Sequence, residues 1–242
     1  MVPAPDPPKG ATKKKRPRHD LRRERNRQLL IDATLALVLE QGSGGLSMVA
    51  ITERAGVHHP AFYSHFRNVD ECLEAAFVHV SNAQHEQTMT LRDSLWQAGR
   101  PDFATELAVT ENSLRTMLQY RQLYLLVLQC RHEQSRIGEL AREDFERSAQ
   151  EITEYVWRAA LYFGAQAKHL REFEKLARYI LEGISAAALE VLHGRAKDIH
   201  AVAERLTRYH WALVTAERER LGAKHSVDSS NTRPASKSSR RR

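Results

Sequence analysis

The stretch that decides the fold is residues 46–66, which read LSMVAITERAGVHHPAFYSHF. Ser47 can cap a short helix over 48–55, because its hydroxyl can accept a bond from a free N–H in the first turn. Gly56 can end that helix, since glycine tolerates the positive φ that a tight turn requires. A second short helix is predicted over 58–66. Two short helices joined in this way are typical of a helix-turn-helix.

Apolar and polar side chains of this stretch separate into two sets. The apolar set is expected to form the small core that fixes the angle between the two helices: Ile51, Ala55, Val57, Phe62 and Phe66. The other set is polar or small and lies on the remaining face of the second helix: His58, His59, Ala61, Tyr63, Ser64 and His65. Such a face suits insertion into the major groove of DNA.

A longer helix is predicted upstream, over residues 21–41. Its apolar face is formed by residues at helical spacing: Leu30, Ala33, Thr34, Leu37 and Val38. Three glycines within residues 42–45 end this helix, because glycine is a poor helix former. Downstream, Asn68 is expected to cap the next helix, with Glu71 placed to complete a capping box.

From Leu30 to about Phe77 the chain resembles the TetR family of transcriptional regulators. The resemblance is carried by LIDATL at 30–35, EQG at 40–42, LS at 46–47, ITERAGV at 51–57 and HHPAFYSHF at 58–66. It implies that residues 58–66 are the recognition helix of a DNA-binding domain. It also implies that the remaining two-thirds of the chain binds a small-molecule effector and pairs with a second copy.

The resemblance further implies roles for single residues. Ser47 would hold a DNA phosphate at the start of its helix. Tyr63 and His65 occupy positions of phosphate and groove contacts, and Ser64 shares their face. The positions that read base edges hold His58, His59, Pro60 and Ala61.

The chain departs from the family pattern at two positions. Val69 stands where the family often has a lysine that contacts phosphate, and Arg67 is expected to take that role. Val49 stands where several members read a base with an arginine. Base preference therefore cannot be transferred from a relative.

Charge is concentrated at the two ends of the chain. The net charge is +7, but residues 1–27 hold ten Lys and Arg against three acidic residues, and residues 224–242 hold six against one. Residues 28–223 are therefore acidic. A basic arm on an acidic body favours a nucleic-acid partner. The arginines that lead from this arm into the first helix are expected to contact the DNA backbone: Arg22, Arg23 and Arg25.

Four segments are predicted: a disordered basic arm at 1–20, the helix-turn-helix domain at 21–67, a ligand-binding and dimerisation domain at 68–222, and a disordered, solvated basic tail at 223–242. Helical stripes recur without strict alternation, which predicts an all-α fold: a three-helix head plus a larger helical bundle. The long helices of the bundle are expected at 69–86, 102–119, 121–131, 136–164, 169–194 and 198–221. No apolar run is long enough to span a bilayer and no secretory signal is evident, so we expect a cytoplasmic protein without a membrane partner.

The larger domain carries two sets of candidate residues. Those for an effector pocket are Trp96, Tyr120, Tyr124, Gln129, Cys130, Trp157 and Tyr162, and each could equally be ordinary core. Those for a homodimer interface lie on two stripes of the last helices: Ile180, Gly183, Ala187, Val191, Leu206, Tyr209 and Leu213. Small residues on the first stripe allow close helix approach.

The combined prediction is a ligand-responsive transcriptional regulator, a repressor that binds a near-palindromic operator as a dimer. No cofactor, metal or catalytic residue is expected. One alternative is a di-iron helical enzyme built on Glu190 and His193, whose spacing such sites use. Another is an architectural DNA-binding factor without an effector, which predicts a filled core in the larger domain.

Overall fold

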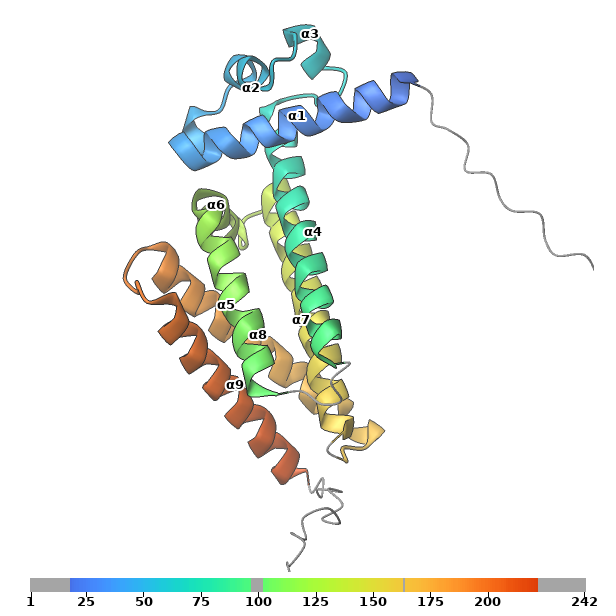
Figure 1. Cartoon of the computed structure of the whole chain (residues 1–242), viewed down its shortest axis with the longest axis vertical. Helices are drawn as coiled ribbons and strands as arrows, with labels where there is room; N and C mark the ends of the chain where they lie inside the picture. The colour runs from blue at the N-terminus through green and yellow to red at the C-terminus, as the bar shows by residue number, and fades with distance from the viewer. Residues whose placement is uncertain (1–17, 97–101, 163, 222–242) are drawn as a thin grey trace, which may run out of the picture. The chain divides into compact units, whose positions relative to one another are not determined.

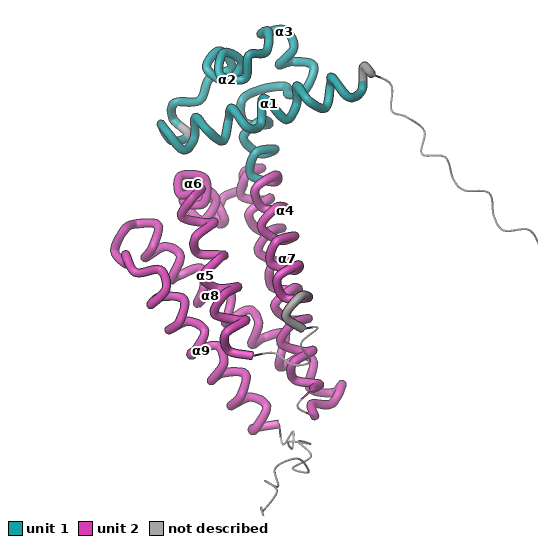
Figure 2. Tube along the Cα trace, in the orientation of Figure 1, with its two compact units in different colours: residues 1–77 teal, residues 78–242 magenta. Residues whose placement is uncertain are grey.

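The computed structural model describes residues 18–96, 102–162 and 164–221 (Figure 1). The chain divides into two compact units, residues 1–77 and 78–242, shown in separate colours in Figure 2. Within the described ranges all regular structure is helical, so the prediction of an all-α fold is confirmed. The predicted basic arm and basic tail lie outside the described residues, apart from the last residues of the arm.

Unit 1 consists of three helices, a short 3-10 turn and the start of a fourth helix. Their bounds are α1 Arg18–Gln41, η1 Ser43–Gly45, α2 Met48–Ala55, α3 His59–Phe62 and α4 Val69–Trp96. The predicted apolar face of α1 is buried, with Leu30 and Val38 fully inaccessible. The polar Thr34 can lie on this buried face because its hydroxyl donates a hydrogen bond to the Leu30 carbonyl at 2.8 Å. Its Oγ1 also lies 3.1 Å from the Cys72 sulfur on α4.

The turn after α2 has the geometry that its sequence predicts. The Ser47 hydroxyl oxygen accepts from the Ala50 N–H at 3.1 Å and so caps α2. Gly56 ends the helix in the left-handed region with φ of 62°. The Val57 N–H then reaches back to the Thr52 carbonyl at 3.0 Å. These bonds satisfy both ends of a very short helix.

The second short helix ends earlier than predicted. Helix α3 ends at Phe62, and the chain continues in tighter turns instead of a helix to Phe66. The Ser64 N–H bonds the Ala61 carbonyl at 3.2 Å and the His65 N–H bonds the Phe62 carbonyl at 2.9 Å. Bonds between residues three apart tighten the last turn of a helix, which explains the difference.

Phe62, at the end of α3, anchors the core between the two short helices. Its side chain is 0% exposed, as is that of Ile51, and Phe66 is also buried. Ala55 and Val57, which the sequence assigns to this core, are only half-buried. Asn68 caps α4 as predicted, since its side chain accepts from the Glu71 N–H at 2.9 Å.

Unit 2 contains the rest of α4 and the remaining helices. These are α5 Phe103–Gln119, α6 Arg121–Cys130, α7 Arg136–Tyr162, η2 Ala167–His169, α8 Leu170–Leu192 and α9 Ile199–Arg220. Helix α4 continues ten residues beyond its predicted end at residue 86. Helix α5 packs along α9, and α7 packs along α8.

The core of unit 2 has two parts. The larger one lies mainly between α7 and α8 and is centred on the fully buried Phe173. The smaller one joins α5, α8 and α9 through Leu114, Ala188 and Ala203. Within the residues that the structure describes, no helix combines the length and apolar character that crossing a membrane requires.

Candidate nucleic-acid interface and internal cavity

The predicted recognition residues lie on the outer face of α3 and the turns that follow it. His58, His59, Pro60, Tyr63 and Ser64 are exposed, whereas Ala61 and His65 are half-buried. Tyr63 is 63% exposed although its neighbour Phe62 is completely buried. The two rings meet edge to face with centroids 5.7 Å apart, so the buried ring fixes the direction of the exposed one.

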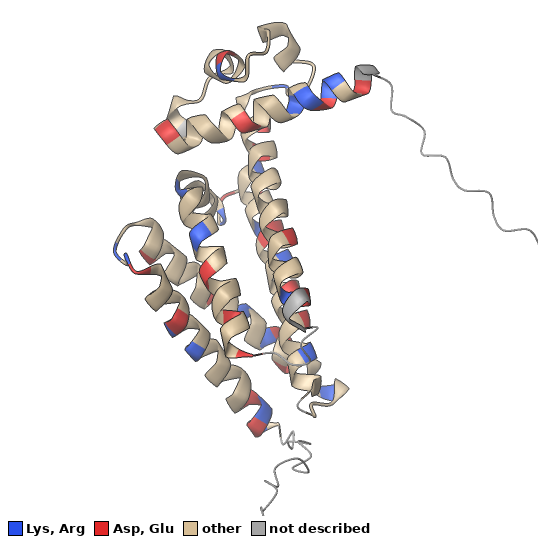
Figure 3. Ribbon diagram, in the orientation of Figure 1, with Lys and Arg blue, Asp and Glu red and all other residues tan. Residues whose placement is uncertain are grey.

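The first turns of α1 bring positive charge beside this face, as Figure 3 shows for the basic residues of that helix. Arg23 donates to the Ser64 carbonyl at 3.4 Å, and the Arg27 guanidinium lies 5.2 Å from the Phe66 ring centroid. Both arginines line a hollow together with His65. Burial lowers the pKa of His65, and the charges of Arg23 and Arg27 lower it further, so its ring is neutral at pH 7.

The remaining predicted DNA-contact residues differ in the hydrogen bonds that they already form. Arg22 and Arg25 are exposed on α1. Ser47 already accepts a bond from the Ala50 N–H, which leaves its hydroxyl hydrogen able to donate to a phosphate. Arg67 is also exposed but is engaged, because its guanidinium donates to the Glu71 carboxylate at 3.1 Å. A phosphate would have to compete with that carboxylate.

A capped short helix, a left-handed glycine and a second short helix with a polar outer face together define a helix-turn-helix domain of the DNA-binding type. The family model for bacterial regulatory proteins of the tetR family matches residues 30–76. The match confirms the resemblance to the TetR family that the sequence of this segment predicts.

Similarity to a curated relative covers the same region. The tetracycline repressor protein class D of Escherichia coli is 30% identical over 73 residues, which are 30% of this chain and 34% of the repressor. The chain therefore matches about a third of that relative's length.

Solved structures extend the likeness to most of the fold. A TetR-family transcriptional regulator from Streptomyces coelicolor aligns with a TM-score of 0.65 and 18% identity, covering 85% of this chain and 91% of that one. A TetR-like regulator from Rhodococcus sp. RHA1 gives 0.55 and 17%, covering 78% and 96%. Unit 2 therefore adds the helical domain of the TetR fold to the head.

Unit 2 encloses a cavity of about 380 Å³, which is the size of a small-molecule site. Most of its wall is apolar, including Val109, Ile152, Val156, Leu181 and Val214. Polar side chains enter it from four helices: Arg92 of α4, Glu106 of α5, Tyr155 of α7 and His210 of α9.

His210 is a neutral polar group of this cavity. Burial lowers its pKa to about 4, so the ring carries no charge at pH 7. Its Nε2 is buried and has no hydrogen-bond partner among the described residues. That nitrogen would lie 3.7 Å from a methyl group built on Gly183, so the two helices α8 and α9 meet closely here.

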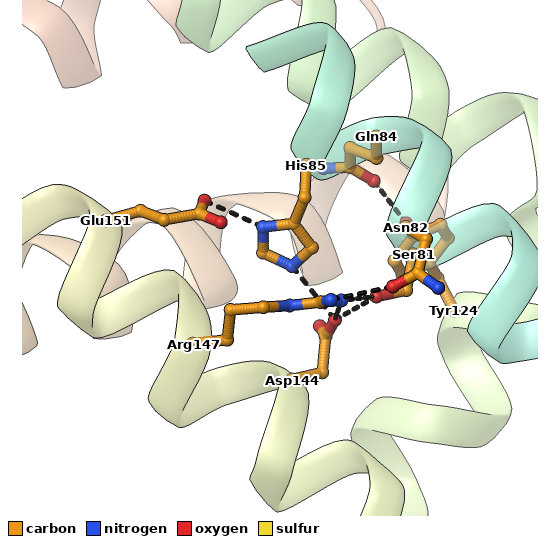
Figure 4. A network of polar contacts seen from close by, with 8 residues as sticks. All are labelled: Ser81, Asn82, Gln84, His85, Tyr124, Asp144, Arg147 and Glu151. Atoms are coloured by element: carbon orange, nitrogen blue, oxygen red, sulfur yellow. Dashed lines mark hydrogen bonds and ion pairs between the residues drawn. The ribbon is translucent and has the colours of Figure 1, made fainter. Parts of the chain in front are cut away.

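A polar network lies at the α4–α7 side of the cavity (Figure 4). The His85 ring bonds Glu151 at 2.7 Å through Nδ1 and Asp144 at 3.1 Å through Nε2. Arg147 donates to Asp144 at 3.2 Å and also to Ser81, which itself donates to Asp144.

The network keeps His85 charged. Burial opposes its protonation, but the hydrogen bonds and charges of Asp144 and Glu151 outweigh burial and raise its pKa to about 9. Both ring nitrogens are then donors, and each has an acceptor. For Asp144, burial is likewise outweighed by its bonds to His85 and Ser81, and its pKa falls.

The cavity is lined by residues other than those proposed for it from the sequence. Tyr124 does not line the cavity, but its hydroxyl donates a hydrogen bond to Gln84, which does. Trp157 packs on Phe173 in the core with ring centroids 5.7 Å apart, and Tyr162 is 47% exposed at the end of α7. Tyr120, Gln129 and Cys130 are also absent from the described lining. The side chain of Trp96 lies outside the described residues.

The predicted dimer residues divide into two groups. Ile180 and Val191 are buried inside their own unit, so their assignment to an intermolecular interface is wrong: they point to the interior of the chain that carries them. Gly183 and Ala187 are half-buried, and Leu206 and Leu213 are partly covered by their own chain. Tyr209 is 57% exposed on α9.

The residues of the alternative iron site face solvent. Glu190 is exposed and forms two bonds with Arg195, at 3.0 and 2.8 Å. The His193 ring contacts the Leu189 carbonyl at 2.8 Å. Across the described ranges no cluster of three or more metal-binding side chains occurs. The two residues thus have the spacing of an iron site without its inward geometry.

Proposed function

We propose that this protein is a transcriptional repressor of the TetR type that binds a near-palindromic DNA operator as a dimer and releases it when a small molecule occupies unit 2. The observation that carries the proposal is the face of α3, where Tyr63 projects outward from a fully buried Phe62. Two such faces, one from each copy, would enter successive major grooves about 34–36 Å apart.

The proposed DNA contacts follow from exposure and charge. His58, His59, Pro60 and Ala61 lie where base edges would be read. Backbone contacts are assigned to a second set, which surrounds the first: Arg22, Arg23, Arg25, Ser47, Tyr63, Ser64, His65 and Arg67. The basic residues before α1 would add further phosphate contacts.

Selection of bound duplexes from a random pool tests this proposal. We expect a palindromic consensus with half-sites one helical turn apart. Tyr63→Ala should weaken binding about tenfold or more, because a hydrogen bond to a charged phosphate contributes about 1.5–3 kcal/mol. Tyr162→Ala removes another exposed tyrosine in unit 2 and should leave DNA binding unchanged. Diffuse binding that ignores both substitutions would favour the architectural factor.

The basic arm has its own measurement. Deleting residues 1–17 removes five Lys and Arg and one Asp. For every phosphate that the shortened chain no longer neutralises, the salt dependence of duplex binding should fall by about 0.9 in slope. An unchanged slope would show that these residues do not touch the operator.

The cavity supports a response to a ligand, since an architectural factor needs no hollow in its helical domain. A ligand can act only if it binds the two DNA-binding states unequally.

We infer that the enzyme alternative is the weaker one, because Glu190 and His193 both face solvent. Metal analysis of the purified protein tests it, and stoichiometric iron would overturn our assignment.

Dimer formation is proposed through the outer faces of α8 and α9. Tyr209 is exposed there, and the small, half-buried Ala187 allows a second helix to approach closely. Tyr209→Asp should shift the mass measured by light scattering from dimer to monomer, because it would bury a charge in the interface. Tyr162→Asp is the control on α7. A monomeric wild-type protein would contradict this part of the proposal.

A further inference from the structure

One end of the cavity in unit 2 combines a cation with a buried carboxyl group. The Arg92 guanidinium lies 4.9 Å from the ring centroid of Tyr155, which fixes its position against the wall. Arg92 Nε and Glu106 Oε1 are both buried, and neither has a hydrogen-bond partner among the described residues. Buried polar atoms are normally satisfied, so these two point to a missing partner.

The charge state of this end follows from its surroundings. Burial raises the pKa of Glu106, and the nearby Arg92 charge and Tyr155 hydroxyl offset only part of that rise. A protonated carboxyl can donate a hydrogen bond as well as accept one. Arginine side chains carry a positive charge in proteins. Because burial disfavours the charged form of Glu106, that carboxyl is a poor counter-ion for the Arg92 guanidinium beside it.

The other polar groups of the cavity do not change this balance. His85 is charged, but Glu151 and Asp144 each accept one of its N–H groups and compensate its charge. His210 is neutral. Arg218 of α9 also lines the cavity.

The space available sets the size of a ligand. A volume of about 380 Å³ holds about a dozen water molecules at roughly 30 Å³ each, so it suits a molecule of about a dozen non-hydrogen atoms. Branched aliphatic side chains form much of the remaining wall, among them Val109, Ile152 and Ile180. Such a wall favours an apolar body.

We propose that the cavity binds a small apolar molecule that ends in one carboxylate, held between the guanidinium of Arg92 and the carboxyl group of Glu106. Arginine suits a carboxylate because its planar donors match the two oxygens. A ligand with an ammonium group would meet the like charge of Arg92. A neutral amide would leave the buried cation without an anion. This inference rests on the proposed effector role of the cavity and specifies the ligand's chemical class.

The test compares three probes of equal length on the full chain without DNA: decanoate, decanamide and decylammonium. Binding is measured by calorimetry at pH 7, below the concentration at which the probes aggregate. We expect decanoate to bind about tenfold or more tightly than either of the others, since charged hydrogen bonds are the strong ones. Equal binding of all three, preference for decylammonium, or no binding of decanoate would each overturn the proposal.

Variants locate the carboxylate. Arg92→Met keeps the length and apolar stem of the side chain and should remove the preference for decanoate. Glu106→Gln keeps a hydrogen-bond donor and should retain that preference. Arg178→Met is the matched control, because Arg178 is exposed and pairs with Glu146 at 2.6 Å on the surface. Circular dichroism and the melting temperature establish that each variant is folded.

The outcomes also separate this inference from the proposed function. Duplex selection reports on DNA binding without any ligand, and calorimetry reports on the cavity without any DNA. A palindromic operator together with no preference for decanoate would overturn the ligand class alone. Preference for decanoate that Arg92→Met leaves unchanged would place the carboxylate elsewhere and overturn the site.

Discussion

The two units place their polar groups in opposite ways. In unit 1 the core is filled by apolar rings and aliphatic chains, with Phe62 and Leu30 completely buried, and the polar residues of α3 face outward. In unit 2 charged and polar side chains reach the interior, around a cavity and beside it. A surface that meets a large rigid partner needs a well-packed support, whereas a site for a small molecule needs interior space and buried polar groups.

The largest effect should come from removing the support of the DNA-binding face. Phe62→Ala should destabilise unit 1 by about 3–5 kcal/mol, because it removes buried apolar surface and leaves a cavity behind. Tyr63→Ala, one residue further, should change stability by less than about 0.5 kcal/mol because its ring is mostly exposed. Hydrogen exchange of the amides in residues 18–77 measures both. Similar destabilisation by the two variants would mean that the exposed ring also supports the core.

The next largest effect is expected on the stability of unit 2, which should depend on pH. The folded pKa of His85 is about 9 against 6.5 for a free imidazole, so its contribution is complete below pH 6.5 and is lost as pH rises to about 9. The shift corresponds to about 3 kcal/mol of unfolding free energy. Urea unfolding of the wild type should show this fall between pH 6.5 and 9.

His85→Gln is the control for this pH dependence. Glutamine does not titrate, so the variant should be less stable at pH 6.5 but lose no comparable stability on going to pH 9. An equal fall in both proteins would assign the pH dependence to another group. The described residues of unit 1 form no such network, and their hydrogen exchange provides an internal reference once exchange rates are corrected for pH.

A smaller effect is expected at the turn of the helix-turn-helix. Gly56→Ala forces a side chain into the left-handed region at φ of 62° and should cost about 1–2 kcal/mol. Gly44→Ala is a matched control, since its φ is not in that region and an added methyl meets nothing within 4 Å. Equal stability of the two variants in thermal unfolding would show that the turn tolerates alanine.

The smallest effect is expected at the residues of the alternative iron site. Glu190→Gln breaks an exposed pair with Arg195 and should change neither the metal content nor the melting temperature to a measurable extent. Loss of bound metal in this variant would instead assign a function to the Glu190–His193 spacing.

Much of unit 1 can be predicted from the sequence because its defining features are set by residues close together in the chain. The buried stripe of α1, the Ser47 cap, the left-handed Gly56 and the Asn68 cap each depend on residues within a few positions of one another. The predicted end of α3 is wrong because helical and 3-10 turns share the same apolar spacing over four residues. Nothing local distinguishes a helix that continues to Phe66 from one that tightens at Phe62.

The larger unit is less predictable because its site forms between distant helices. Trp157 and Tyr124 are aromatic like many pocket residues, yet which side of the wall they occupy depends on the packing of α4, α6 and α7. A usable signal is present in α5, where Glu106, Thr110 and Ser113 recur at helical spacing on a face that is otherwise apolar. Polar residues on an inward stripe indicate a cavity better than aromatic residues do.

The dependence on packing between distant helices also explains why the assignment of Ile180 and Val191 of α8 to the dimer interface is wrong. This helix has apolar residues on more than one face, and spacing alone does not say which face is turned inward. Ile180 and Val191 contribute to the core, and the exposed side carries Tyr179 and Ala186 instead. Only the positions of the neighbouring helices decide between the two.

The burial of Cys72 in the core of unit 1 has a consequence for chemical labelling. Burial raises the pKa of the Cys72 thiol to about 11, and burial also raises that of Cys130, the second of the two cysteines in the chain. Thiolates are the reactive form, so both natural cysteines should react slowly with maleimides. A cysteine introduced at the exposed Ser64 would therefore accept a fluorophore selectively, and the natural chain can serve as its own unlabelled background.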